Sequence, residues 1–592
     1  MSAVSGKPHT TFTIKKARIF DGEFVIPADT VFVENGRIAG VGQALEHSAH
    51  SEIIDGTGCT LLPGLIDSHT HILGNSLKQA LVFGVTTELD MGTDCKFAAE
   101  VKSKQANGDL LDWADLFSAG ALVTAPGGHG TEYGMKVPTI TGPEEAQAYV
   151  DARISEGSDY IKIIYDDGGS YGLSIPTVSK ETLAAVIRAA RSRSKLSLVH
   201  AVSCREAQDA IECGCSGLAH LFTDQMPRAD FGAFVAKAKA FVIPTLTVLE
   251  SIAGVPSGVS LLAHPQLAPY FTEGDKANLK RSFLVLPGLS QNYRAAEEAV
   301  RQLKAAGVPI LAGSDVPNFG TVHGASLHRE LELLVQAGLS PTEALAAATS
   351  VPANTFGLTD RGRIKTGSRA DLLLVQGDPV DDIRATRNIV RIWKGGAALN
   401  RADYLAATEC SRVEEMRLRD APPPGGSDSG WVSNFEDMAP TTRFGMGWVV
   451  STDSMAGGNS TAKFRVVAEG AKGSLGSLLI EGEVVPGYPF PWAGAMFVPG
   501  GAPMQAVNLS SKKRISFWAK GDGATYRVML SARSYWPVPV ARFFVASREW
   551  KHYAFEISDF DGMDGHDLTG VIFAAGPQLA QFAFQIDDVR FE

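Results

Sequence analysis

The segment Gly64-Leu65-Ile66-Asp67-Ser68-His69-Thr70-His71 decides the fold of this chain. An apolar run from Leu61 to Ile66 predicts a short strand that ends beside the two histidines. Side chains two positions apart on a strand point to the same face, so His69 and His71 are expected to project together. Two imidazoles placed in this way can bind one metal ion, although a His-X-His pair also occurs in strands that bind none. The remaining sequence has to decide between these interpretations.

Length and composition limit the class of protein. With 592 residues the chain is expected to form two or three domains. The net charge of −11 and the lack of a Lys/Arg-rich run argue against a nucleic-acid partner. No apolar run is as long as a membrane span, so no membrane partner is expected. The first eleven residues lack the apolar core of a signal peptide, which favours a cytoplasmic location unless a leader has been removed.

The middle of the chain has the texture of an α/β barrel. Between residues 63 and 356, strand-like apolar runs alternate with helical stretches, and there are eight such β→α units. That number predicts a (β/α)8 TIM barrel. A doubly wound open sheet is the alternative fold, but no Gly-X-Gly-X-X-Gly motif follows any of these strands at a helix start.

Short strands flank the barrel on both sides. Residues 11–62 and 357–418 contain them, and we expect the two segments to form one small composite β-sandwich. A Pro/Gly/Ser-rich linker is predicted at residues 419–430. Beyond it, residues 431–592 are rich in short strands, aromatic residues and Gly/Pro turns, which predicts a C-terminal all-β sandwich of the jelly-roll kind.

Polar side chains gather at the predicted carboxyl ends of the barrel strands. In a TIM barrel these ends meet at one mouth. Five of the 13 histidines lie at or just beyond such ends, which is more than unrelated local roles would explain. The residues, in chain order, are His69, His71, His129, Lys162, His200, His220 and Asp315.

These motifs resemble the metal-dependent amidohydrolase superfamily, in particular its imidazolonepropionase-like and prolidase-like carboxypeptidase branch. The resemblance covers roughly residues 11–400. The segments that carry it are Pro63 to His71, Asp159-Tyr160-Ile161-Lys162-Ile163, Val199-His200-Ala201, Ala219-His220, Gly313-Ser314-Asp315 and Gly362-Arg363-Ile364-Lys365-Thr366-Gly367-Ser368-Arg369-Ala370-Asp371-Leu372.

The resemblance implies a binuclear metal centre. It implies two Zn²⁺ ions, or another divalent metal, per chain. One ion would be held by His69, His71 and Asp315, and the other by His200 and His220. Lys162 would bridge both ions as a carboxylated lysine, because an ammonium group has no lone pair to offer a metal. The alternative for Lys162 is a barrel lysine paired with Asp166 or Asp167.

The implied chemistry is attack of a metal-bridging hydroxide on an amide carbonyl, with Asp315 as the catalytic proton carrier. The expected substrate is a small amide, namely a dipeptide or an N-acyl amino acid, as for a carboxypeptidase or an ochratoxinase. A cyclic amide, a lactone or a phosphoester is the alternative substrate. The alternative outside enzymes is a carbohydrate-binding or assembly protein with an inactive barrel. Relatives in this branch are often homo-oligomers, so a homo-oligomer is expected.

Three further residues are predicted to contact the substrate. His129 stands in the glycine-rich stretch Gly127-Gly128-His129-Gly130, where backbone can approach a ligand closely. Tyr165 follows the fourth strand, and His323 lies in a loop before a predicted helix. A neighbouring histidine, His328, falls inside that helix and is expected to pack rather than to bind.

The last segment resembles the complex I intermediate-associated protein 30-like domain, which is related in shape to galactose-binding jelly rolls. The residues that carry this resemblance include Asn434-Phe435-Glu436 and the stretch from Phe584 to Phe591. Aromatic residues at Trp492, Tyr535 and Trp536 would suit glycan stacking. The alternative, that most aromatic residues of this domain belong to its core, is the favoured one.

Overall fold

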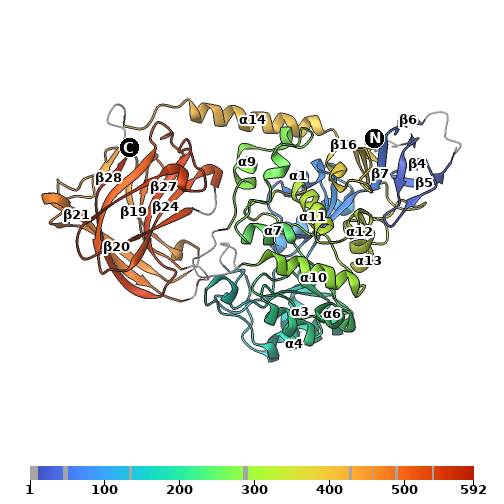
Figure 1. Cartoon of the computed structure of the whole chain (residues 1–592), viewed down its shortest axis with the longest axis horizontal. Helices are drawn as coiled ribbons and strands as arrows, with labels where there is room; N and C mark the ends of the chain where they lie inside the picture. Colours follow the sequence, from blue (N-terminus) through green and yellow to red (C-terminus); the bar gives the residue numbers. More distant parts are fainter. Residues whose placement is uncertain are drawn as a thin grey trace, which may run out of the picture. The chain divides into compact units, whose positions relative to one another are not determined.

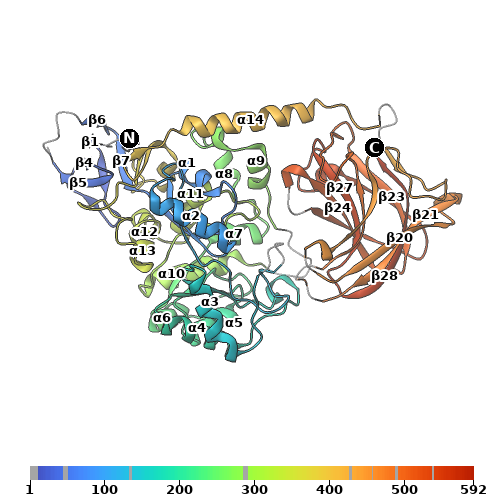
Figure 2. The same cartoon turned by 180° about the vertical axis from the view of Figure 1, so that it is seen from behind.

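The computed structural model describes residues 11–43, 51–131, 137–283, 291–425, 430–456, 458–486, 488, 491–535 and 539–592. The chain forms two compact units, which Figures 1 and 2 show from opposite sides. The first unit contains Met1–Ala125, Val137–Phe271 and Leu279–Ala406, and the second contains Pro126–Lys136, Thr272–Asn278 and Ala407–Glu592. A search of the described helices for one long and apolar enough to span a bilayer finds none.

A closed ring of parallel strands forms the centre of the first unit, as predicted. Two runs of parallel strands, β8-β9-β10 and β11-β12-β13-β14, make up most of the ring. The two runs are joined where Val123 bridges Ile163. The eighth segment closes the ring, because Ile310 bridges Val242 and Val316 bridges Thr70. The strands are β8 (Leu65–Thr70), β9 (Val85–Asp90), β10 (Asp115–Ser118), β11 (Ile161–Ile164), β12 (Ser197–His200), β13 (Gly217–Ala219) and β14 (Phe241–Ile243).

Helices cover the outside of this barrel (Figure 1). Their starts follow capping rules: Ser179 caps α4 by accepting from the Thr182 amide, and Ser203 and Glu206 form a capping box on α5. The helices are α1 (Ser76–Val82), α2 (Cys95–Asn107), α3 (Ala146–Ser155), α4 (Lys180–Ser192), α5 (Cys204–Glu212), α6 (Phe231–Ala238), α7 (Leu246–Ile252), α8 (Val259–Leu262), α10 (Tyr293–Ala305), α11 (Ala325–Gln336), α12 (Pro341–Ala347) and α13 (Ser350–Thr355). The helix α9 (Glu273–Leu279) belongs almost entirely to the second compact unit.

The inside of the barrel is packed, as expected of eight strands. Ile66, Leu198, Ile243 and Leu311 belong to one buried cluster that fills it. A larger cluster lies between the strands and the helices. It includes Val199 and Val242, which stand next to the inward-pointing Leu198 and Ile243 on their strands. Apolar side chains therefore hold both faces of the sheet.

Strands from both flanks of the barrel form the small β unit, as predicted. Its two sheets have the orders β5-β4-β1-β6 and β17-β16-β15-β7-β2-β3. The predicted single strand from Leu61 to Ile66 is in fact the end of β7 and the start of β8, which Gly64 separates. A Cβ on Gly64 would lie 2.3 Å from the Thr86 side chain. The strands are β1 (Phe12–Lys15), β2 (Arg18–Phe20), β3 (Val25–Ile26), β4 (Thr30–Glu34), β5 (Arg37–Gly42), β6 (Glu52–Asp55), β7 (Cys59–Pro63), β15 (Leu372–Gln376), β16 (Ile389–Lys394) and β17 (Ala397–Ala398).

The C-terminal unit is an all-β sandwich, as predicted. One sheet has the order β20-β21-β28-β23-β26, with β18 also paired to β28, and the other has the order β19-β22-β27-β24-β25. The helix α14 (Arg401–Arg419) before it was not predicted. The strands are β18 (Trp431–Ser433), β19 (Gly447–Thr452), β20 (Thr461–Ala468), β21 (Gly476–Val484), β22 (Ala493–Val498), β23 (Arg514–Gly521), β24 (Thr525–Ala532), β25 (Val540–Val545), β26 (Lys551–Glu556), β27 (Leu568–Ala575) and β28 (Ala580–Phe591).

Aromatic side chains fill the space between the two sheets of this sandwich. Phe517 and Phe573, for example, stack edge to face with their ring centroids 4.9 Å apart. Tyr535 is buried and its hydroxyl donates to the Asp561 carbonyl, so it is not an exposed platform for a glycan. Trp536 lies outside the described residues. The prediction that the aromatic residues of this domain belong to its core therefore holds for Tyr535.

Candidate metal centre

Six predicted ligands lie together at the carboxyl ends of the barrel strands. The rings of His69 and His220 have centroids 4.6 Å apart, as have those of His200 and His220. The ring of His71 is 5.5 Å from that of His69. Lys162 and Asp315 contact the same group of rings, as the next paragraphs describe. His69 and His71 come from the end of β8, Lys162 lies within β11, and the other three residues stand at or just after the ends of further strands, so the barrel fold itself brings them together.

The carboxylate of Asp315 is the centre of this group. Its Oδ1 lies 3.3 Å from Nε2 of His69 and 3.4 Å from Nε2 of His71. Its Oδ2 lies 3.8 Å from Nδ1 of His220. One potential ligand atom each from His69, His220 and Asp315 fit within 4.8 Å of one another. Imidazole nitrogens with one carboxylate are the donor set that zinc and similar divalent metals prefer.

Hydrogen bonds indicate which ring nitrogen carries the proton in two of the histidines. Nδ1 of His71 lies 3.3 Å from the Gly92 carbonyl, which can only accept. Nδ1 of His220 lies 2.8 Å from the Thr245 hydroxyl, which itself donates to the Pro244 carbonyl. In both rings the proton is therefore assigned to Nδ1, and Nε2 keeps its lone pair.

His200 contacts a carboxylate that the sequence did not suggest as its partner. Nε2 of His200 lies 3.5 Å from Oδ2 of Asp166, and both side chains are buried. The other oxygen of Asp166 accepts from the Gly168 amide at 2.8 Å, which fixes the carboxylate. Such a carboxylate–histidine pair is the usual way in which a protein orients a metal-binding imidazole.

Lys162 is buried among these histidines. Its Nζ lies 3.2 Å from Nε2 of His69, and the side chain is 1% exposed. Among the described residues no carboxylate lies within ion-pair distance of Nζ; Asp166 contacts His200, and Asp167 pairs with Arg205. These contacts give no support to the alternative in which Asp166 or Asp167 pairs with this lysine. Burial lowers the pKa of Lys162 to about 7, although the charges of Asp315 and Asp90 act in the opposite direction.

The backbone is held in an unusual conformation at three residues of the site. His220, Thr245 and Asp315 have φ of 77°, 52° and 54°. Residues other than glycine rarely adopt positive φ, and this conformation is enriched at functional sites. The surrounding barrel must stabilise it. Burial also lowers the pKa of His69 well below its usual value, with Lys162 the next contributor, so its imidazole is neutral and able to act as a ligand.

The three residues predicted to contact the substrate have different surroundings. His129 lies in a loop that belongs to the second compact unit, so its role stays a prediction. The Tyr165 hydroxyl donates to Asp209 on α5 at 3.1 Å, which gives it a structural partner. Nδ1 of His323 lies 3.0 Å from the buried carboxylate of Glu88. His328 is buried in α11 and contacts the Phe83 carbonyl, as expected of a packing residue.

Sequence reasoning missed the roles of several residues that support or border the site. Asp166 and Thr245 orient His200 and His220, as described above. Asp90 accepts from the Ile72 amide at 3.0 Å, and burial raises its pKa to about 6 while the His71 charge opposes this. The pKa of Tyr171 is raised well above its usual value by burial and by nearby Asp166 and Asp315. The sequence signal that could have pointed to Tyr171 is its position two residues beyond Gly169, in a Gly-rich loop after β11.

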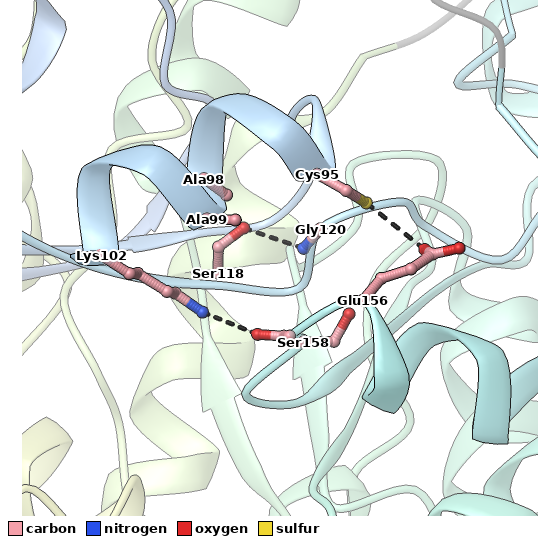
Figure 3. Close-up of a pocket in the computed structure, with 9 residues that line it drawn as sticks. Cys95, Ala98, Ala99, Lys102, Ser118, Gly120, Glu156 and Ser158 are labelled. Atoms are coloured by element: carbon pink, nitrogen blue, oxygen red, sulfur yellow. Dashed lines mark hydrogen bonds between the residues drawn. The ribbon is translucent and has the colours of Figure 1, made fainter.

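A small cavity lies away from this group, between α2 and the turn before β11 (Figure 3). It is lined by residues that include Cys95, Lys102 and Glu156 and has a volume of about 20 Å³. Cys95 Sγ contacts Glu156 at 3.5 Å, and Lys102 Nζ donates to the Gly157 carbonyl at 2.8 Å. Such a volume accommodates a water molecule and excludes an amide substrate.

Comparison with known proteins agrees with this geometry. The model of the amidohydrolase family matches residues 60–399, which is more than half of the chain. The chain belongs to the amidohydrolase family. It is therefore a hydrolase of that superfamily, whose members generally bind divalent metal ions. The complex I intermediate-associated protein 30 (CIA30) model matches residues 434–569, within the C-terminal sandwich. Both family resemblances proposed from the motifs are thus confirmed.

Individual relatives of this family member are distant. An imidazolonepropionase of Cereibacter sphaeroides is 25% identical over 404 residues, which cover 62% of this chain and 92% of the relative. A putative prolidase from Bifidobacterium longum has a crystal structure with a TM-score of 0.53 and 26% identity, covering 68% of this chain and all of that one (100%). A Xaa-Pro dipeptidase structure has a TM-score of 0.54 at 22% identity, covering 66% of this chain and 100% of that one, and it shows the fold alone.

Proposed function

We propose that this protein hydrolyses an amide bond of a dipeptide or an N-acyl amino acid at a binuclear zinc centre. The observation that carries the proposal is the meeting of His69, His71, Lys162, His200, His220 and Asp315 at one end of the barrel. The tautomers assigned to His71 and His220 support it, because in both rings the proton is on Nδ1 and Nε2 carries the lone pair that a metal needs.

The residues fit a pair of metal ions. His69, His71 and Asp315 would hold one ion, and His200 and His220 the other. Lys162 would connect them after its amine adds carbon dioxide: a new N–C bond forms, the amine loses a proton to solvent, and an anionic carbamate with two oxygens results. The lack of a carboxylate partner for Lys162 among the described residues supports this, since a permanent buried ammonium group there would remain unpaired.

The chain's own side chains then have distinct tasks. When bound, the metal ions would lower the pKa of the attacking water and polarise the substrate carbonyl. Asp315 would accept the proton of that water and deliver it to the leaving amine, and the contacts of its two oxygens with different histidines support this role. Thr245, Gly92 and Asp166 keep the imidazoles in a fixed orientation.

The choice of substrate rests on the relatives. The Bifidobacterium longum neighbour is described as a putative prolidase, which supports a peptide-like amide. The imidazolonepropionase relatives support a cyclic amide as the second candidate substrate. Contacts of His129, Tyr165 and His323 with the substrate, a homo-oligomeric state and a glycan contact of the C-terminal domain remain predictions.

A hydrolysis screen with the zinc-loaded protein tests the proposal. We expect turnover of dipeptides or N-acyl amino acids, and no turnover by the Asp315→Asn variant with an unchanged circular dichroism spectrum. Turnover of lactones or phosphoesters alone would favour the other substrate classes. A folded, metal-loaded protein that hydrolyses none of these compounds would favour an inactive barrel.

A further inference from the structure

The outer face of the sheet β19-β22-β27-β24-β25 carries an arginine in an apolar setting. Arg527 lies on β24 between Tyr526 and Val528, which both enter the core of the sandwich, so its side chain lies on the opposite face. That face has an apolar cluster of its own, in which Met529, Ile572 and Ala574 are buried and Trp492 packs against them. β24 and β27 lie side by side there (Figure 1).

The guanidinium of Arg527 bonds to a backbone carbonyl. Nη2 donates to the Ala575 carbonyl at 3.2 Å, while Nε is buried and has no hydrogen-bond partner. No carboxylate of the described residues pairs with it. Burial lowers the pKa of this guanidinium to about 10. The residue is half-buried, and its inner Nε lacks a partner in a setting where a buried polar group normally has one.

The chain leaves room for this guanidinium. A Cβ on Gly576, just after β27, would lie 2.9 Å from Nη2 of Arg527 and 2.2 Å from the Pro491 carbonyl oxygen. A larger residue there would displace the arginine. On the other side, Phe543 of the edge strand β25 stands directly opposite Arg527 and is 44% exposed. The cation thus lies between a backbone cradle and an exposed ring.

We propose that this face binds a small organic acid, with its carboxylate on Arg527 and its apolar part on Phe543 and Trp492. A guanidinium presents parallel N–H groups that match a carboxylate, and an anion would supply the missing partner. The apolar surroundings favour an aromatic or aliphatic acid over a sugar. The indole N–H of Trp492 is also already used, since it donates to the Ser451 hydroxyl at 3.2 Å.

Isothermal titration of the full-length protein with 3-phenylpropionate tests this proposal. We expect binding by the wild type that is weakened at least about tenfold in Arg527→Gln. Arg542→Gln is the matched control, because Arg542 lies on the neighbouring strand and contacts Phe560 instead. Any binding at the barrel would persist in both variants. The neutral amide of the same acid should not compete, and acetate should bind more weakly.

Three results would overturn the proposal. One is the absence of binding to the wild type, and another is equal binding by Arg527→Gln. The third is equal binding of acetate, which would reduce the site to a simple anion contact. Thermal unfolding gives a separate readout: Arg527→Met should keep or raise the melting temperature if the arginine serves a ligand. A fall of several degrees would instead assign it a structural role.

Discussion

Nζ of Lys162 lies 3.2 Å from Nε2 of His69, and no described carboxylate forms an ion pair with it. A buried lysine in this position is explained if its amine is carboxylated and does not remain a charged ammonium group. A carbamate on Lys162 would supply the ligand oxygens that the unmodified lysine lacks, and two divalent cations would balance its negative charge. Three of the predictions below concern this arrangement and the residues that support it, and the fourth concerns a separate buried cluster of ion pairs around Asp115.

Replacing Lys162 with alanine should remove the bridge. We expect loss of at least one metal ion per chain and a fall in activity of at least about 100-fold. Added acetate or propionate should restore part of both, because a free carboxylate can occupy the vacated space. Lys195→Ala is the control: its Nζ donates to the Ser158 carbonyl, and metal content should not change. Full metal content in Lys162→Ala would contradict the bridging role.

Replacing Thr245 with valine removes the acceptor that holds the Nδ1 proton of His220. The ring would then be free to change tautomer or to rotate, and metal affinity should fall by about 10- to 100-fold. Thr245→Ser keeps the hydroxyl and should retain near-normal affinity. Competition with a chromophoric chelator measures both variants. Equal affinity in Thr245→Val and the wild type would show that this hydrogen bond does not matter.

Replacing Asp166 with asparagine should loosen His200. The amide is isosteric but carries no charge, so the ring loses its anionic partner at 3.5 Å. We expect weaker metal binding and an unchanged unfolding temperature of the metal-free protein. The half-buried neighbour Asp167 pairs with Arg205 and provides the control Asp167→Asn. A similar loss of metal in both variants would argue against a specific role of Asp166.

The buried carboxylate of Asp115 should set acid stability. It pairs with Arg361 and Lys394, each at 2.6 Å, and also with Arg369. Burial alone would raise its pKa, but these three cations lower it below the usual value. Because the folded-state pKa is depressed, the stabilisation is present above the unfolded value of 3.8 and is lost as pH falls through the folded one.

Asp115→Asn tests this, because it leaves three cations without their shared partner. It should reduce the free energy of unfolding at pH 7 by about 3–5 kcal/mol. Chemical denaturation from pH 7 down to pH 3 measures the effect, and the variant should lose less stability with acid than the wild type. Asp112→Asn, at an exposed ion pair with Lys78, should change little. Equal pH slopes for Asp115→Asn and the wild type would contradict the assignment.

The sequence predicted much of the site because its main residues follow strands. His200 and His220 end apolar runs, and a barrel necessarily brings strand ends together. The supporting residues could not be found in this way. Thr245 reaches His220 from the next strand, and Asp166 reaches His200 from a loop, so both depend on register and loop geometry. The division at Gly64 was missed because β7 and β8 form one continuous apolar run.

Metal stoichiometry is the most direct test of the central claim. The wild-type protein, loaded with zinc in the presence of bicarbonate and then desalted, should contain about two zinc ions per chain by plasma mass spectrometry. Carbon-13 NMR after loading with labelled bicarbonate should show a carbamate signal that Lys162→Ala lacks. A wild-type protein that keeps no metal and shows no such signal would contradict the account.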